Sequence, residues 1–159
     1  MINEISWAEM ESLMRALART INASSWQPDS VVCIGRGGML IGDAMSRLLT
    51  GRPPLGVLMA SSYRGLDGDQ QRKQLRIAEH ISIASPEGLG QRVLLVDDLA
   101  DTGISLAAIK KRLLTQEPGV KEVRTATLWM KVRSAIEPDF VAAPPVNAET
   151  WISMPFERV

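Results

Sequence analysis

The chain has 159 residues, of which 45% are hydrophobic and 23% are charged. This composition is typical of a soluble globular protein. A single domain over residues 1–159 is expected, because a chain of this length can bury a sizeable core without disulfides or a structural metal. Eighteen basic residues balance eighteen acidic ones, so a general attraction to nucleic acid or to anionic lipid is not expected.

Cysteine and histidine counts exclude further classes. The single cysteine, Cys33, excludes an internal disulfide, and the single histidine, His80, excludes a metal site that needs two imidazoles. No apolar run reaches the roughly 18 residues of a membrane span, and the first residues lack the basic segment of a signal peptide. We therefore expect a cytoplasmic protein without a transmembrane segment.

The first half of the chain predicts two helices and two strands. Ser6 and Glu9 form a capping box ahead of an apolar stripe, which predicts a helix of about 16 residues. Strands are expected at 31–34 and 55–62, with a helix at 39–49 between them. A polar stretch from Tyr63 to Leu75 and an alternating segment from 76 to 83 then predict a hairpin with a mobile, flap-like loop, or a plain surface hairpin.

The second half predicts a parallel sheet. Residues 93–96 form a continuous apolar run, typical of a strand covered on both faces, which is expected to end at Asp97. A helix at 105–115 and strands at 122–130 and 139–142 are expected to follow. Strands that alternate with helices predict an α/β fold with helices on both faces of the sheet. In such folds ligands bind outside the carboxyl ends of the strands.

The loop after this apolar strand carries the strongest chemical signal. Asp97, Asp98 and Asp101 place three carboxylates within five residues, and they need cations, hydroxyls or other donors nearby. The segment 102–105 offers hydroxyls and free N–H groups at the start of a helix, which suits a phosphate. Together these features indicate a ligand with a diol and a phosphate, such as a ribose 5-phosphate. A plain turn and helix cap is the alternative, and a P-loop is excluded because no Gly-Lys-Ser/Thr follows.

A second loop, Gly35–Gly38, also joins a strand to a helix. Its three glycines allow the backbone to approach an anion closely, while the Arg36 guanidinium neutralises the charge. A tight turn without function is the alternative for this loop alone. Both loops are expected at the same edge of the sheet, where their ligand chemistries complement each other.

The segment Val93–Ser105 resembles the signature by which phosphoribosyltransferases of the type I fold bind 5-phosphoribosyl 1-pyrophosphate (PRPP). The aspartate at position 101 resembles the family members that act on 6-oxopurines, which carry Asp at this position. The resemblance runs in order from about residue 31 to 157 and is greatest to the short bacterial xanthine/hypoxanthine/guanine enzymes. It implies the type I phosphoribosyltransferase fold, a parallel sheet flanked by helices, with a flexible hairpin flap at about 63–75 and a small hood from the N-terminal and C-terminal segments. The other matching segments are Gly35–Gly38, Ser61–Tyr63, Lys131 and Trp151–Glu157.

The resemblance implies purine salvage: transfer of the 5-phosphoribosyl group from PRPP to N9 of guanine, xanthine or hypoxanthine, with release of pyrophosphate. Asp97 and Asp98 would hold the ribose hydroxyls directly or through Mg²⁺. Glu157 aligns with an acid used around a second metal, where relatives usually carry Asp. The peptide bond entering Gly37 is expected to be cis. The 5′-phosphate would be bound by Asp101, Thr102, Gly103, Ile104 and Ser105, and the pyrophosphate by Arg36, Gly37, Ser62 and Tyr63.

For the purine base the resemblance implies four residues. Asp101 would accept the N7 proton as general base. Lys131 would donate to the 6-oxygen, because an ammonium cannot accept a hydrogen bond from the amine of adenine. Trp151 would stack on the base and the Ile152 backbone would read the 2-position, while the flap excludes water. The alternatives are a solvated lysine at a strand end and a Trp-Ile pair in the core.

Three rival functions remain at this point. They are a PRPP-binding regulator of nucleotide synthesis without catalysis, a phosphoribosyltransferase for another base, and a flavodoxin-like module that binds another phosphate. Asp101 and Lys131 count against the first two, since a regulator needs neither a base for N7 nor a donor for the 6-oxygen. The resemblance implies a homodimer or homotetramer with small-molecule substrates and no nucleic-acid partner. The first helix and the segment after Arg36 are the expected contact surfaces.

Overall fold

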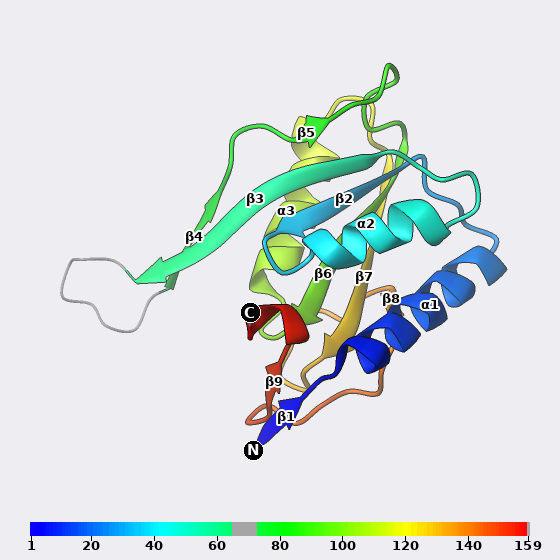
Figure 1. The fold of residues 1–159 in the computed structure, drawn as a ribbon. Coiled ribbons are helices and arrows are strands. Elements are labelled where there is room, and N and C mark those ends of the chain that lie inside the picture. The colour runs from blue at the N-terminus through cyan, green and yellow to red at the C-terminus, as the bar shows by residue number, and fades with distance from the viewer. Residues whose placement is uncertain (65–72, 159) are drawn as a thin grey trace.

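A computed structural model describes residues 1–64 and 73–158 of the chain (Figure 1). Within these ranges no helix combines the length and the apolar character that a membrane span needs. In chain order the elements are β1 (Ile2–Glu4), α1 (Trp7–Ala23), β2 (Ser30–Gly35), α2 (Met39–Leu48), β3 (Leu55–Arg64), β4 (Lys73–Ile77), β5 (Ser82–Ile83), β6 (Arg92–Ala100), α3 (Ile104–Gln116), β7 (Glu122–Met130), β8 (Phe140–Val141), β9 (Trp151–Ser153) and the 3₁₀ turn η1 (Pro155–Glu157).

The main sheet is mostly parallel. Its strand order is β4-β3-β2-β6-β7-β8, and β5 pairs with β3 beside this path. The five strands β3, β2, β6, β7 and β8 run parallel to one another, whereas β4 and β5 run antiparallel to β3. Helices α1 and α2 cover one face and α3 covers the other (Figure 1). This arrangement confirms the predicted α/β fold with helices on both faces of a parallel sheet.

The core is split by the sheet into two layers. Val31 and Leu94 pack with the helices α1 and α2, while their neighbours in sequence, Val32 and Leu95, pack with α3. All four side chains are fully buried. Because successive side chains of a strand point to opposite faces, a strand covered on both sides must be apolar at every position, as β2 and the first half of β6 are.

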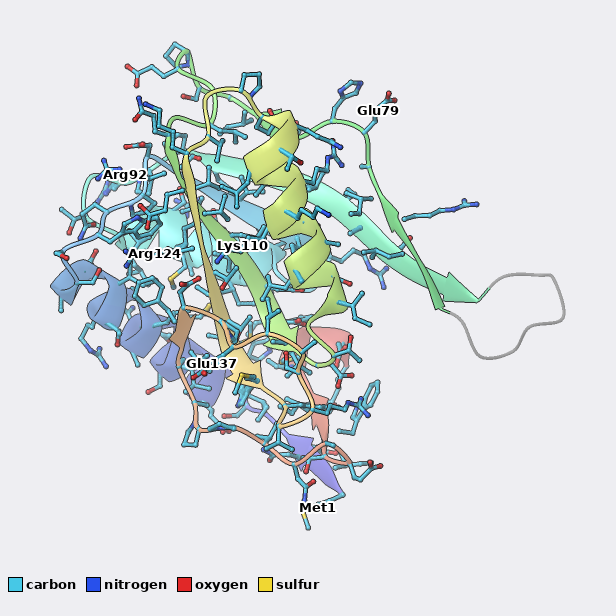
Figure 2. All side chains as sticks on the ribbon, turned by 180° about the vertical axis from the view of Figure 1, so that it is seen from behind. Met1, Glu79, Arg92, Lys110, Arg124 and Glu137 are labelled. Carbon is cyan, nitrogen blue, oxygen red and sulfur yellow. The ribbon has the colours of Figure 1, made fainter. Side chains whose placement is uncertain are left out.

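A second, small sheet joins the two ends of the described chain. Strand β1 pairs in parallel with β9, so that Ile2 lies opposite Trp151. We call this pair the terminal sheet. Beyond it, the N–H of Ile5 donates to the carbonyl of Ser153 at 3.0 Å, and the Arg158 guanidinium donates to the carbonyls of both Ile5 (2.6 Å) and Ser153 (3.0 Å). The segment before α1 and the segment after β9 are therefore held together. In Figure 2, Met1 lies at the far end of the molecule from Arg92, the first residue of β6.

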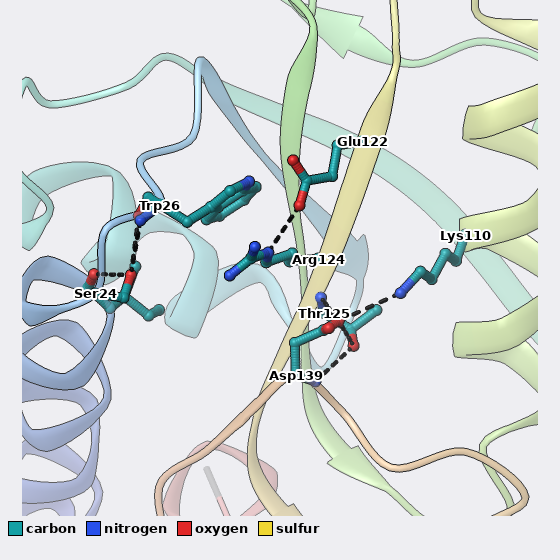
Figure 3. Close-up of polar contacts among 8 residues, drawn as sticks. Ser24, Trp26, Lys110, Glu122, Arg124, Thr125 and Asp139 are labelled. Atoms are coloured by element: carbon teal, nitrogen blue, oxygen red, sulfur yellow. Dashed lines mark hydrogen bonds and ion pairs between the residues drawn. The ribbon is translucent and has the colours of Figure 1, made fainter.

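The junction between β7 and the edge strand β8 is fixed by one carboxylate. Oδ2 of Asp139 accepts hydrogen bonds from the backbone N–H (2.8 Å) and the hydroxyl (2.9 Å) of Thr125. The same oxygen forms an ion pair with Nζ of Lys110 on α3, at 3.3 Å (Figure 3). The N–H of Asp139 donates back to the Thr125 hydroxyl at 3.0 Å. This cluster ties the short strand β8 to both the sheet and the helix that covers it.

Two strand predictions are corrected by the structure. The alternating segment 76–83 is not one strand, because the Arg112 guanidinium of α3 binds the carbonyls of Ala78 and Glu79 and separates β4 from β5. The strand after residue 92 does not end at Asp97 but continues to Ala100, because β7 pairs with it as far as Met130. The rest of the predicted flap, residues 65–72, lies outside the described residues.

Candidate active site

Two loops meet at the carboxyl edge of the parallel strands. Residues 36–38 follow β2, and residues 101–103 follow β6. A cavity of about 280 Å³ is lined by Ile34, Gly35, Arg36, Gly37, Ala60, Ser61, Leu75, Asp97, Asp98, Ser105 and Glu157. A second cavity of about 240 Å³ is lined by Leu75, Asp97 and Leu99 to Leu106. Leu75, Asp97 and Ser105 line both, so the two cavities adjoin.

The loop 35–38 lies directly against the two aspartates of β6. A Cβ atom on Gly37 would lie 2.7 Å from Cγ of Asp98, and a Cβ on Gly38 would lie 2.6 Å from the carbonyl oxygen of Val96. Only glycine allows this approach at either position. The structure has a cis peptide bond at Gly35–Arg36. The expected position, Arg36–Gly37, is therefore wrong by one residue, since the residue types alone do not specify which bond of a glycine-rich turn adopts the cis form.

Asp97 and Asp98 form a half-buried carboxylate pair at the centre of the first cavity. Burial raises the pKa of Asp97 well above its ordinary value, and the adjacent charge of Asp98 adds to the effect. Burial also raises the pKa of Asp98, with a smaller contribution from the charge of Glu157. The backbone N–H of Asp98 donates to Oδ1 of Asp97 at 2.9 Å. A proton or a cation at this pair would offset the cost of burying its negative charge.

The cavity suits Mg²⁺ shared with a ligand rather than enclosed by protein. Among the described residues no three acidic, histidine or cysteine side chains cluster closely enough to hold an ion by themselves. Glu157 lines the cavity, but its Oε2 already accepts the N–H of Met154 at 2.9 Å. A hard cation bound by one or two carboxylates, with ligand phosphate oxygens and water, is the arrangement that Mg²⁺ prefers. The residues present therefore fit this ion.

Asp101 lies beyond the strand end and contacts two cations. Its Oδ1 accepts a hydrogen bond from Nε of Arg133 (2.7 Å) and forms ion pairs with Nη2 of Arg133 (2.5 Å) and Nζ of Lys131 (3.3 Å). The side chain of Lys131 is only 6% exposed, whereas those of Asp101 and Arg133 are 42% and 43% exposed. Lys131 is thus a buried cation beside the acid and not a solvated lysine at a strand end.

Arg133 is the residue of this cluster that the sequence analysis missed. An arginine three residues after a strand has no local signature, and its partner Asp101 is 32 residues earlier in the chain. Only the structure shows that the two segments pair. The N–H of Lys131 donates to the carbonyl of Ala100 at 2.9 Å, and the N–H of Ala135 donates to the carbonyl of Thr102 at 2.8 Å. These bonds flank Asp101 and bring the turn 131–135 against the loop.

The start of α3 is built to receive an anion. Gly103 occupies the N-cap position with a φ of +74° and itself provides no side-chain cap. The Thr102 hydroxyl lies 3.5 Å from the N–H of Ile104. The first N–H groups of a helix have no partner within the helix, and they attract negative charge. Thr102, Gly103, Ile104 and Ser105 all line the second cavity.

The structure does not bring every predicted residue to these cavities. Trp151 and Ile152 line neither of the two, although both lie on β9 of the terminal sheet. Trp151 is 61% exposed and Ile152 is buried, so the core alternative holds for the isoleucine and fails for the tryptophan. Ser62 and Tyr63 belong to β3, but their side chains lie outside the described part of the structure.

A parallel sheet with a glycine-arginine loop and an acidic loop at one edge defines an α/β protein whose candidate ligand site lies at the carboxyl ends of its strands. The family described as "Phosphoribosyl transferase domain" matches residues 6–155. The xanthine-guanine phosphoribosyltransferase of Idiomarina loihiensis is 32% identical over 155 residues, which are 96% of this chain and 85% of that protein. The chain belongs to the phosphoribosyltransferase family.

Two solved structures agree with this assignment. The purine phosphoribosyltransferase from Pyrococcus horikoshii has a TM-score of 0.76 and 26% identity, and the alignment covers 98% of this chain and 93% of the other. The xanthine-guanine-hypoxanthine phosphoribosyltransferase of Helicobacter pylori has a TM-score of 0.75 and 25% identity, with 99% and 94% covered. The fold is the type I phosphoribosyltransferase fold.

Proposed function

We propose that the protein is a purine salvage enzyme that transfers the 5-phosphoribosyl group of PRPP to N9 of a 6-oxopurine. The observation that carries the proposal is the pairing of Asp101 with the buried Lys131, 3.3 Å apart, beside the anion-binding start of α3. An acid that can take a proton and an ammonium that can only donate match the N7–H and the 6-oxygen of such a base. The relatives named above act on xanthine, guanine, hypoxanthine or purines, by their names.

PRPP would be held across the two adjoining cavities. The backbone and hydroxyls of 102–105, with Asp101 at their edge, bind the 5′-phosphate at the start of α3. Arg36 and Gly37, with Ser62 and Tyr63 from the end of β3, bind the pyrophosphate. Asp97 and Asp98 hold the ribose hydroxyls and Mg²⁺, with Glu157 at the same cavity. Bound Mg²⁺ would neutralise charge on the pyrophosphate and so improve it as a leaving group.

The reaction breaks the C1′–O bond to pyrophosphate and forms the bond from C1′ to N9. Positive charge develops on the ribose while negative charge leaves with the pyrophosphate, so the site acts mainly by positioning and electrostatic stabilisation. Asp101 accepts the N7 proton as N9 attacks. Lys131 donates to the 6-oxygen, which gains charge as that proton leaves. Trp151 stacks on the base from the terminal sheet, which serves as the hood, and the Ile152 backbone faces the 2-position.

The remaining features of the proposal concern the surroundings of the site. We propose that the enzyme acts in the cytoplasm as a homodimer or homotetramer, and that it needs neither nucleic acid nor a membrane for this reaction.

The test is a spectrophotometric assay with PRPP and Mg²⁺ in which guanine, xanthine, hypoxanthine and adenine are supplied separately. We expect turnover of at least one 6-oxopurine but not of adenine, and a loss of kcat of about 100-fold or more in Asp101→Asn, the range of a general base. Asp43→Asn is the matched control, because Asp43 pairs with Arg47 on the exposed side of α2.

Two outcomes would overturn the proposal. Turnover of adenine in preference to every 6-oxopurine would make the protein a phosphoribosyltransferase for another base. Tight binding of PRPP in calorimetry without conversion of any base would make it a PRPP-binding regulator, and the next experiment would be a search for its macromolecular partner.

A further inference from the structure

The Asp101 cluster holds one negative and two positive charges. Arg133 makes the shorter contacts to Oδ1, at 2.5 and 2.7 Å, and Lys131 makes the longer one, at 3.3 Å. The carboxylate charge is therefore compensated mainly by the guanidinium. What remains is the positive charge of a nearly buried ammonium, which forms its ion pair with this same carboxylate oxygen.

Resting on the function proposed above, we propose that Arg133 is a positioning residue that determines specificity: by pairing with Asp101, it keeps the Lys131 ammonium available to the 6-oxygen of the purine. Without Arg133, Lys131 would be left alone to compensate the Asp101 carboxylate, with which it already pairs at 3.3 Å. A buried ammonium forms its strongest hydrogen bonds with an ionised acceptor, so Lys131 would turn fully to Asp101. An ammonium held by this carboxylate would be less available as the donor for the 6-oxygen.

The backbone explains why Arg133 can act in this way. Residues 131–134 form a turn closed by the N–H of Ser134 on the carbonyl of Lys131, 2.9 Å long. Bonds from Lys131 to Ala100 and from Ala135 to Thr102 then hold this turn on both sides of Asp101. The two cations thus approach one carboxylate from a single rigid turn. Because the Arg133–Asp101 pair is more than 40% exposed, its contribution to folding stability is small, and its removal tests the site rather than the fold.

The experiment is a double-mutant cycle with Arg133→Gln and Lys131→Gln, assayed with the preferred 6-oxopurine. We expect Arg133→Gln to lower kcat/KM for the base by about tenfold, the size expected for a hydrogen bond to a charged group, while KM for PRPP changes less than about twofold. Arg133→Lys restores most of the loss because it restores the charge. In the Lys131→Gln background, Arg133→Gln has little further effect, since the residue it acts through is gone.

The matched control is Arg92→Gln, which removes an ion pair of similar exposure, Arg92–Asp29, at the opposite end of β6 and leaves kcat/KM unchanged. Additive losses in the cycle, or an unchanged kcat/KM in Arg133→Gln, would overturn the inference while wild-type turnover leaves the proposed function standing. Thermal unfolding of each variant identifies any loss of kcat/KM that comes from impaired folding. If Arg133→Gln is destabilised, the charge-retaining variant Arg133→Lys tests the inference, because it should restore most of kcat/KM. Absence of turnover in the wild-type enzyme would instead overturn the proposed function.

Discussion

At the scale of single residues, Gly103 brings the loop 101–103 against the turn that follows Lys131 and Arg133. Its φ of +74° is left-handed, and a Cβ atom there would lie 2.6 Å from the Ser134 hydroxyl oxygen and 3.0 Å from the Ile136 nitrogen. An alanine would therefore be strained and would also push the turn 131–136 away from Asp101.

Gly103→Ala should raise KM for PRPP and lower kcat by about tenfold or more, because an error near 1 Å in position can cost this much or more. Steady-state kinetics and urea unfolding measure the two effects. Gly88→Ala is the control, since Gly88 has a similar φ of +62° but a Cβ atom there would meet none of the described residues within 4 Å. Equal behaviour of the two variants in both measurements would contradict a special role for the Gly103 contact.

At the scale of elements, the edge strand β8 depends on Asp139. Burial by itself would raise the pKa of this carboxyl, but the hydrogen bonds from Thr125, together with Lys110, outweigh it and lower the pKa below its ordinary value. A carboxyl whose pKa is lower in the folded than in the unfolded protein stabilises the fold above its unfolded pKa, near 3.8. That stabilisation is lost as the pH falls through the lower, folded pKa.

Asp139→Ala should lower the free energy of unfolding at pH 7 by about 1–3 kcal/mol, since it leaves the Thr125 groups without their partner. The difference from the wild type should shrink as the pH falls below about 4, where the wild-type carboxylate becomes protonated. Urea unfolding at several pH values measures this. Asp43→Ala, which removes an exposed pair on α2, should have little effect at any pH, and a pH-independent loss in Asp139→Ala would contradict the charge-based explanation.

The sequence predicted correctly those helices and strands that are specified by their own residues. The bounds of β7 are those expected from the sequence, 122–130, and α1 begins after Ser6, whose hydroxyl accepts the N–H of Glu9 at 3.1 Å. Cys33 is fully buried, as expected, and burial raises the pKa of its thiol to about 11. What local patterns missed depends on neighbours far away in sequence: β6 extends because β7 lies beside it, and residues 78–81 leave the sheet because Arg112 binds the carbonyls of Ala78 and Glu79.

The same distinction applies to the site. The glycine-arginine loop and the acid-rich loop are contiguous motifs, so their meeting at one sheet edge followed from the alternation of strands and helices. The Arg133 contact joins residues 32 positions apart and has no motif of its own. The burial of Lys131 likewise comes from the turn docked on loop 101–103, which composition does not encode.

At the scale of the whole molecule, apolar side chains gather beside the loop 35–38. Met39 and Leu40 of α2 are each 43% exposed and Met59 of β3 is 45% exposed, and the sulfurs of both methionines lie against Gly35. Single exposed apolar residues are ordinary, but a contiguous patch indicates a contact surface. This patch includes the segment after Arg36, which the sequence analysis expected at a subunit interface.

Sedimentation velocity of the wild-type protein should therefore show a dimer or tetramer, and Leu40→Glu should shift it toward the monomer, since a buried charge without a partner opposes association. Leu114→Glu on α3, where the leucine is 41% exposed, is the control and should not change the sedimentation coefficient. A monomeric wild type, or dissociation by Leu114→Glu alone, would contradict this interface.

The terminal sheet has a consequence for how the chain matures during synthesis. Strand β1 leaves the ribosome well before its partner β9, which is made about 150 residues later, and the Arg158 contact with Ile5 spans 153 positions. Contacts of such large sequence separation form late, because a long loop must close before they do. A nascent chain can thus assemble both phosphate-binding loops while Trp151 still has no strand to present it. Under the proposed function, the newly made enzyme would gain its sugar-phosphate site before its purine site, and the last step of folding would also be the step that completes the catalyst.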